Sequence, residues 1–291
     1  MASDYPDDSL AGTGEFAVID RLVAGRPQPG LVLLGPGDDA AVVASVDGRT
    51  VVCTDMLVEN RHFRLDWSSP HDVGRKAIAQ NAADIEAMGG RATAFVVAFG
   101  APGDTATTRA VELADGMWHE AGLIGAGIVG GDMVQAPQWV ISVAALGDLG
   151  GLDAVRRSGA KLGDSVAVTG ELGRSAAGFA LWTAAVGGSD DGGFSDADDL
   201  DGFRQRHLVP EPPYGQGVVA ARAGASSMID VSDGLLADVG HIASASGVCV
   251  DLSAAGLRGD VDALVGAAAA VGSDPWLWVL GGGEDHALVA T

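Results

Sequence analysis

The stretch VGRKAIAQNAADIEAMGGRATAFVVAF, residues 73–99, decides the fold class. Residues 73–88 have the spacing of a helix, and residues 94–99 form a short apolar run with β-branched residues, typical of a buried strand. The same two patterns recur along the chain. Further helices are predicted over residues 16–23, 105–121, 174–184, 235–245 and 261–270. Further strands are predicted over residues 31–34, 40–46, 50–54, 140–146, 165–169, 226–229, 248–252 and 278–280. Helices and strands that mix throughout predict an α/β (α+β) architecture.

The length of 291 residues favours two domains. The glycine-rich stretch 147–163 is the expected boundary, so we expect domains over residues 1–148 and 149–291. Two cysteines, Cys53 and Cys249, lie far apart in apolar segments, and we expect both to be buried free thiols of a cytoplasmic protein. The acidic N-terminus, MASDYPDDSL, does not resemble a secretion signal.

The charge excludes one class of partner. The chain has 39 Asp and Glu against 17 Lys and Arg, which gives a net charge of −22. Nucleic acid requires clustered basic residues, so we expect no nucleic-acid partner. Apolar runs stay well short of the roughly 20 residues that cross a bilayer, so we expect no membrane partner either. Six of the aspartates lie in residues 187–201, a polar glycine-rich segment predicted to be an exposed loop.

Other carboxylates lie singly or in pairs at predicted turns, beside glycines or strand ends. They occur in GPGDD (35–39), CTD (53–55), NAADIEAMGG (81–90), GGD (130–132) and DVSDG (230–234). Each alone could be a turn former or a helix cap. Asp84 is harder to explain in this way, because a carboxylate near a helix C-terminus opposes the helix dipole. Hard oxygen ligands suit Mg²⁺, and neighbouring glycines let a polyphosphate approach the backbone. The pattern therefore indicates a site for Mg²⁺ and phosphate.

Other phosphate and catalytic patterns are missing or out of context. The Walker A pattern and the G-x-S-x-G elbow are absent, and the dispersed histidines and cysteines do not form a zinc pattern. The only G-x-G-x-x-G match, residues 125–130, precedes a strand-like segment instead of opening a helix, which excludes a dinucleotide fingerprint.

The order of motifs is similar to that of one family. GDDAAVV (37–43), TDMLVENRHF (54–63), GRKAIAQNAADIEAMGG (74–90), VGGD (129–132), DVSDGLLADVGHIA (230–243) and GGGED (281–285) follow one another. This series resembles the thiamine-monophosphate kinase family, whose superfamily includes aminoimidazole ribonucleotide synthetase, selenophosphate synthetase and a hydrogenase maturation factor. The resemblance runs from about residue 14 to the end of the chain.

The resemblance implies a fold and a reaction. The fold is the two-domain aminoimidazole-ribonucleotide-synthetase-like fold, in which the N-terminal sheet domain pairs into a barrel in a homodimer. Family members extend some tens of residues beyond the GGED motif, so we expect the C-terminal α/β domain to be incomplete at its end. The reaction is ATP-dependent phosphorylation of thiamine monophosphate to thiamine diphosphate, assisted by several Mg²⁺ ions and with K⁺ as a further candidate cation. Positioning and charge neutralisation dominate such phosphoryl transfer.

The resemblance also implies residue roles. The N-terminal domain would bind ATP and Mg²⁺ and form the dimer. The implied metal ligands are Asp39, Thr54, Asp55, Asp84, Asp132, Asp230 and Asp233. The implied ATP contacts are Gly131, Asp132, Arg157 and Ser232, and the implied substrate contacts are His62 and Glu284. No side chain is implied as a covalent catalyst.

Two positions depart from the family, and alternatives remain open. Ala83 stands where a serine is frequent, and His286 stands where a tyrosine usually follows GGED. One alternative is another ATP-using enzyme of the superfamily, similar to aminoimidazole ribonucleotide synthetase or to the hydrogenase maturation factor. Another is a non-catalytic protein that binds a nucleotide or a thiamine phosphate.

Overall fold

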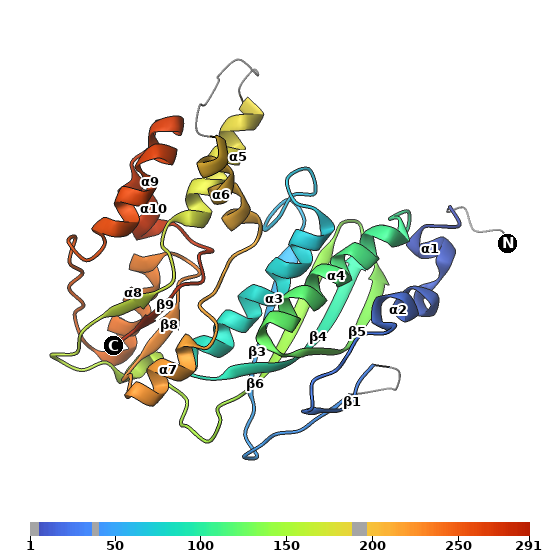
Figure 1. The fold of residues 1–291 in the computed structure, drawn as a ribbon, viewed down its shortest axis with the longest axis horizontal. Helices are drawn as coiled ribbons and strands as arrows, with labels where there is room; N and C mark the ends of the chain where they lie inside the picture. The colour runs from blue at the N-terminus through green and yellow to red at the C-terminus, as the bar shows by residue number, and fades with distance from the viewer. Residues whose placement is uncertain (1–5, 37–40, 188–196) are drawn as a thin grey trace. The chain divides into compact units, whose positions relative to one another are not determined.

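The computed structural model describes residues 6–36, 41–187 and 197–291 (Figure 1). These residues form two compact units. The first comprises the chain up to Ile85 together with Arg91–Gly151, and the second comprises Glu86–Gly90 with Leu152–Thr291. Within these ranges, every helix is too short or too polar to cross a membrane. The mixed α/β architecture predicted from the sequence is confirmed.

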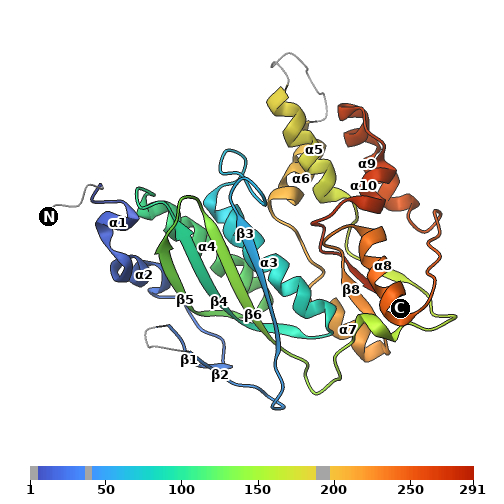
Figure 2. The same cartoon turned by 180° about the vertical axis from the view of Figure 1, so that it is seen from behind.

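A four-stranded sheet organises the first unit. Its strands lie in the order β3 (Val51–Val58), β6 (Val140–Asp148), β4 (Arg91–Ala101) and β5 (Gly127–Gln135). β6 is antiparallel to both of its neighbours, whereas β4 and β5 are parallel and joined through a helix. Helices α3 (Pro70–Ala87) and α4 (Thr107–Ile124) cover one face of this sheet, as Figures 1 and 2 show from opposite sides. Phe95 and Ile141 of the sheet and Ile78 of α3 are fully buried in the core between them.

The other face of the sheet carries exposed apolar side chains. Residues of β6 alternate between buried and half-buried along the strand, as expected for one covered face. On the uncovered face, the exposed apolar residues are Val52 and Met56 of β3, Val96 of β4 and Val134 of β5. Exposed apolar side chains on the open face of a sheet are typical of an interaction surface.

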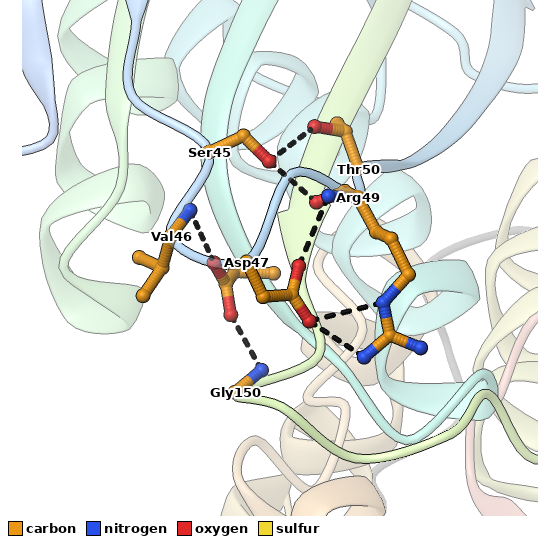
Figure 3. Close-up of polar contacts among 7 residues, drawn as sticks. Ser45, Val46, Asp47, Arg49, Thr50 and Gly150 are labelled. Carbon is orange, nitrogen blue, oxygen red and sulfur yellow. Dashed lines mark hydrogen bonds and ion pairs between the residues drawn. The ribbon is translucent and has the colours of Figure 1, made fainter.

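Short elements precede the sheet. α1 (Leu10–Thr13) and α2 (Glu15–Val23) are followed by an antiparallel pair, β1 (Val32–Leu34) and β2 (Val42–Val43). A polar turn then leads into β3 (Figure 3). In this turn Asp47 accepts hydrogen bonds from the Arg49 backbone at 3.0 Å and from its guanidinium at 2.6 Å, which lowers the pKa of Asp47. The backbone N–H of Val46 donates to Asp148 at 3.4 Å, so the turn is fastened to the end of β6.

A three-stranded antiparallel sheet lies in the second unit, in the order β7 (Ala167–Thr169), β9 (Leu288–Ala290) and β8 (Met228–Asp230). Its buried core joins Ile229 and Val289 of the sheet with Leu235, Leu264 and other helical residues. The helical elements of this unit are the 3₁₀ turn η1 (Arg157–Gly159), α5 (Arg174–Gly187), α6 (Ala197–Leu208), α7 (Gln216–Ala223), α8 (Leu235–Ser246), α9 (Arg258–Val271) and α10 (Pro275–Gly281).

Four predictions from the sequence are wrong in part. Residues 278–280 belong to helix α10 instead of a strand, because Asp274 caps its N-terminus and Pro275 occupies its first turn. Residues 248–252 form no strand; alternate apolar side chains of this segment pack against the core without ladder pairing. The predicted loop 187–201 ends in α6, where Leu200 is buried. Both cysteines are free, but Cys53 is only half-buried and Cys249 is exposed.

Candidate functional site

Strand β3 carries two neighbouring candidates on opposite faces of the sheet. Asp55 is half-buried on the face that α3 covers, and Thr54 is exposed on the uncovered face. Adjacent strand residues must alternate in this way. The Thr54 hydroxyl donates to the carbonyl of Val143 at 2.8 Å, within the sheet. The sequence pattern predicts that this strand ends next to Asp55, but β3 continues to Val58. Asp39 lies outside the described residues.

Asn81 joins Asp55 to helix α3. β3 is an edge strand, and the backbone N–H of Asp55 donates to the Asn81 side-chain oxygen at 3.0 Å. The Asn81 amide donates in turn to the carbonyl of Ala77 at 2.9 Å, and the Asn81 residue is fully buried. Asp84 is half-buried one helical turn beyond Asn81, close to the C-terminus of α3. The geometry therefore gathers Asp55 and Asp84 at one edge of the sheet.

Asp132 occupies the opposite edge, on β5. It is exposed and pairs with Ala98 in the parallel ladder. The preceding Gly131 is required by packing, because a Cβ atom there would lie 2.1 Å from the carbonyl oxygen of Val97. The sequence pattern predicts that Asp132 lies at a strand end, but β5 continues to Gln135.

The sheet register separates Asp132 from Asp55. One row across the four strands, on the covered face, consists of Asp55, Val143, Val97 and Gly131. The next row, on the uncovered face, consists of Met56, Ser142, Ala98 and Asp132. Three interstrand spacings of about 4.8 Å place the two aspartates roughly 14 Å apart, on opposite faces. Within one chain, the structure does not bring them to a common ion.

His62 lies in the loop after β3 and is exposed. Its backbone N–H donates to the carbonyl of Val58 at 3.0 Å. The Val58 N–H donates to Nδ1 of the His62 ring, also at 3.0 Å. Because Nδ1 is the acceptor, the neutral ring carries its hydrogen on Nε2. The ring is therefore held in one tautomer at the end of β3.

In the second unit, the segment DVSDG (230–234) joins β8 to α8, as predicted. Asp230 is buried, and its Oδ2 lies 3.2 Å from Nδ1 of the buried His286. Asp233 is exposed. The buried Asp238 accepts hydrogen bonds from the backbone N–H groups of Asp233 and Gly234 at 3.0 and 3.1 Å, in the first turn of α8. Burial, together with the charges of Asp230 and Asp233, raises the pKa of Asp238.

This group has the donor set of a cation site. Asp233, Asp238 and His241 each have a ligand atom that lies within 4.8 Å of the ligand atoms of the other two. Burial and the nearby charges of Asp230 and Asp233 both raise the pKa of Asp238, and a bound cation would balance these charges. The residues that gather here fit a divalent cation.

The GGGED segment packs directly against DVSDG. The Glu284 N–H donates to the carbonyl of Ser232 at 2.8 Å, and the His286 N–H donates to the carbonyl of Val231 at 2.9 Å. A Cβ at Gly283 would lie 2.5 Å from the Ser232 carbonyl oxygen, so this approach requires glycine. Glu284 and His286 both have positive φ angles, of 62° and 52°. Such backbone strain in residues other than glycine is concentrated at functional sites.

Asp285 fastens this strained segment to helix α5. Its carboxylate accepts hydrogen bonds from the Gly173 N–H at 2.5 Å and the Ser175 N–H at 2.9 Å, where α5 begins. Asp285 is buried, and burial raises its pKa to about 6. The arrangement fixes the direction of its neighbour Glu284.

Glu284 borders a small charged pocket. The Glu284 carboxylate lies 3.6 Å from Nδ1 of His207, which in turn lies 3.1 Å from the Ser175 hydroxyl. Arg174 and Arg206 both pair with Glu171, at 3.2 and 3.3 Å. The pocket is lined by Glu171, Arg174, Arg206, Pro210, Glu211, Glu284 and Asp285. Its volume of about 20 Å³ has room for little more than a water molecule, so its charged side chains compensate mainly one another.

Arg157 lies away from this group within its unit. It is exposed, and its carbonyl accepts a hydrogen bond from the Ser246 hydroxyl at the C-terminus of α8. Asp233 lies before the N-terminus of the same helix, whose 12 residues span about 18 Å. The structure brings Asp230, Ser232, Asp233 and Glu284 together, and it leaves Arg157 at the far end of α8.

Sequence reasoning missed several of these residues. Asp238 and His241 lie inside the quoted motif DVSDGLLADVGHIA, and an acidic residue in the first turn of a predicted helix was an available signal. Asn81 lies in another quoted motif. His207, Arg174 and Arg206 had no sequence signal, because they reach the pocket from segments distant in the chain.

The sequence is similar to that of known proteins. Residues 37–149 match the model of the AIR synthase related protein, N-terminal domain. The chain is 66% identical over 290 residues to a thiamine-monophosphate kinase of Mycobacterium tuberculosis (strain ATCC 25618 / H37Rv), covering 100% of this chain and 83% of that protein. A thiamine-monophosphate kinase of Corynebacterium glutamicum is 42% identical over 295 residues, covering 99% of this chain and 86% of that protein.

Solved structures show the same fold. A thiamine-monophosphate kinase from Stenotrophomonas maltophilia K279a superimposes with a TM-score of 0.77 at 34% identity, covering 95% of this chain and 85% of that chain. AaThiL complexed with AMPPCP and TMP gives a TM-score of 0.69 at 29% identity, covering 97% of this chain and 85% of that chain. The hydrogenase maturation protein HypE of E. coli gives a TM-score of 0.65 at 18% identity, covering 94% of this chain and 81% of that chain. At this identity the similarity shows a shared fold alone.

Proposed function

The chain belongs to the thiamine-monophosphate kinase family, and from this premise we propose that it transfers the γ-phosphoryl group of ATP to thiamine monophosphate. A phosphate oxygen of thiamine monophosphate forms a bond to the γ-phosphorus while the bond from that phosphorus to the bridging oxygen of ADP breaks. The products are thiamine diphosphate and ADP. The observation that carries this proposal is the backbone hydrogen bond from Glu284 to Ser232, which brings two motifs of the resemblance, GGGED and DVSDG, into direct contact.

Divalent cations are part of the proposal. Bound Mg²⁺ would neutralise the phosphates of two anionic substrates on a protein of net charge −22. In the first unit, Asp55 and Asp84 share one edge of the sheet and are assigned to one ion group, together with Asp39. Thr54, whose side chain lies on the other face of β3, is assigned to a separate ion. In the second unit, Asp230 and Asp233 are assigned to another, supported by the donor set at the start of α8. Asp132, on the far edge of the sheet, is assigned to a further Mg²⁺ ion and to ATP. K⁺ is included as a further candidate cation.

The substrates are assigned to separate residues. ATP is assigned to Gly131, Asp132, Arg157 and Ser232, and thiamine monophosphate to His62 and Glu284. Support comes from a relative of the same fold that was solved with AMPPCP, an analogue of ATP, and TMP. The chain's own residues position the reactants: Asp285 sets the direction of Glu284, and the Val58 backbone holds His62 in one tautomer. Reactions of this class depend on such positioning.

We also assign a homodimer, formed through the uncovered face of the first sheet, and a cytoplasmic location. The N-terminal domain, residues 1–148, is assigned to ATP, Mg²⁺ and dimerisation, and residues 149–291 to the α/β domain. Exposed Val52, Met56, Val96 and Val134 support the pairing. Met56→Glu is expected to give monomers in analytical ultracentrifugation. Leu123→Glu, at an equally exposed apolar position on α4, is the control and should leave the dimer intact. A wild-type monomer would contradict the assignment.

The reaction is tested with a coupled assay for ADP in the presence of Mg²⁺. Thiamine monophosphate, thiamine and the substrate of aminoimidazole ribonucleotide synthetase are offered separately as acceptors. We expect ADP release that depends on thiamine monophosphate. ADP release that requires another acceptor would point to a different enzyme of the superfamily, and ATP binding in calorimetry without turnover would indicate a non-catalytic binding protein.

A further inference from the structure

Helix α3 buries a lysine beneath the loop that carries His62. Lys76 is one of two lysines in the chain, and only 2% of its surface is exposed. A buried ammonium group is costly unless hydrogen bonds or charges compensate it, and lysine is therefore rarely found in a core without a partner. A lysine on the surface can be explained by solubility alone, but the buried position of Lys76 requires another explanation.

The Lys76 ammonium reaches the loop backbone. Its Nζ donates a hydrogen bond to the carbonyl oxygen of His62 at 3.1 Å. The same loop is tied to the sheet by Glu59, whose N–H donates to the Trp139 carbonyl at 2.9 Å and whose carboxylate accepts from the Trp139 N–H at 3.0 Å. Asn60 turns the chain with a φ of 62°, and its N–H donates to the Phe63 carbonyl at 2.7 Å.

These contacts act on different parts of the loop. Glu59 fixes its beginning and Val58 fixes the His62 ring, whereas Lys76 holds the peptide group that follows the His62 Cα atom. A charged donor gives a stronger hydrogen bond than a neutral one, and more so in a buried setting. Lys76 thereby sets where the imidazole stands relative to the end of β3.

We propose that Lys76 is a positioning residue for His62. Its buried ammonium holds the His62 carbonyl so that the ring presents Nε2 at a fixed place for thiamine monophosphate. The proposal rests on the assignment of His62 to the substrate. It extends that assignment by naming the group that makes the loop rigid before substrate arrives, which lowers the cost of ordering the site on binding.

The test compares Lys76→Met, which keeps the stem and removes the donor, with Lys76→Arg, which keeps a charged donor. Lys161→Met is the matched control, because Lys161 is the other lysine and is exposed. We expect Lys76→Met to lower kcat/KM for thiamine monophosphate by about 10- to 100-fold, mainly through KM. The KM for ATP should change less than about twofold. Lys76→Arg should recover part of the loss, and Lys161→Met should match the wild type.

Two structural readouts accompany the kinetics. In ¹⁵N NMR of the wild type, Nδ1 of His62 should have the shift of an unprotonated acceptor, and Lys76→Met should move that shift toward mixed tautomers. Amide exchange at Arg61 and His62 should accelerate in Lys76→Met but not in Lys161→Met. If Lys76→Met does not fold, the wild-type His62 signal and the kinetics of Lys76→Arg decide the question.

The outcomes separate this proposal from the proposed function. Unchanged His62 shifts and unchanged exchange in folded Lys76→Met would overturn the positioning role. A loss of stability with unchanged KM for thiamine monophosphate would also overturn it, because a purely structural role predicts that result. If His62→Ala leaves that KM unchanged, the assignment of His62 to the substrate fails, while the exchange data still judge Lys76 by itself.

Discussion

In the first unit, Asp55 and Asp84 lie on a regular strand and a regular helix, joined by the buried Asn81. In the second unit, Asp230, Asp233 and Glu284 lie at a strand end and in two loops pressed against each other, with positive φ angles at Glu284 and His286. The first group takes its geometry from secondary structure. The second takes its geometry from close backbone contact, strain and buried polar partners. Regular elements can be predicted from a sequence pattern, whereas contact between two loops cannot.

The largest expected effect concerns the first group. Asp84→Asn removes a negative charge from the edge shared with Asp55, and we expect Mg²⁺-dependent kcat to fall by at least about 100-fold, because charge stabilisation by bound metal is worth several kcal/mol. Thermal unfolding without Mg²⁺ should change little. Glu112→Gln, at an exposed site on α4, is the control. An unchanged kcat for Asp84→Asn would remove this residue from the metal group.

The second group should respond to pH through Asp285. Burial raises its pKa from 3.8 to about 6, so between these values the folded protein holds a proton that the unfolded chain has released. The contribution of Asp285 to stability is therefore present at low pH and is lost as pH rises through about 6. The shift corresponds to about 3 kcal/mol at most.

Asp285→Asn tests this contribution by urea unfolding across the same pH range. The variant loses one hydrogen bond to α5 at every pH, so a constant offset is expected. Beyond that offset, the variant should gain stability relative to the wild type as pH rises to about 7. Asp262→Asn, at an exposed site on α9, should show no such trend. A pH-independent difference between Asp285→Asn and the wild type would contradict the buried-carboxylate account.

The smallest expected effect is on stability, and it is tested by a matched pair of substitutions at two glycines of β5. Gly131→Ala places a Cβ 2.1 Å from the Val97 carbonyl oxygen, whereas the position of a Cβ at Gly130 is open. We expect Gly131→Ala to lose about 1–3 kcal/mol of unfolding free energy in urea. Gly130→Ala should change it by less than about 1 kcal/mol. Equal losses in the two variants would show that the tight β4–β5 approach does not decide the choice of glycine.

Much of the regular structure follows from sequence pattern. Residues 73–99 contain both the helix and the strand that were predicted, since helical spacing and a β-branched run are local signals. Residues 278–280 were mistaken for a strand because Trp and Val favour strands, although Asp274 and Pro275 carried a helix-start signal. Strand β9 lies outside every predicted strand, and its pairing with β7 and β8 in the folded chain defines it.

The sequence predicts which residue types form the site better than it predicts where those residues lie in the fold. Carboxylates beside glycines pointed to cation and phosphate chemistry, and Asp230 to Asp233 do join a strand to a helix. Alternation along β3 alone implies that Thr54 and Asp55 face opposite ways. The separation of Asp132 from Asp55 depends on strand order, and the contacts of Asn81, His207 and Asp285 depend on tertiary packing, so neither could be read from local sequence.

The most direct test of the central claim follows the transferred phosphoryl group itself. Enzyme, Mg²⁺, thiamine monophosphate and ATP labelled with ³²P at the γ position are incubated, and the products are separated by chromatography. The account predicts that the label appears in the terminal phosphate of thiamine diphosphate, in a one-to-one ratio with the ADP formed. Label recovered only in inorganic phosphate, or thiamine diphosphate without label, would contradict direct transfer.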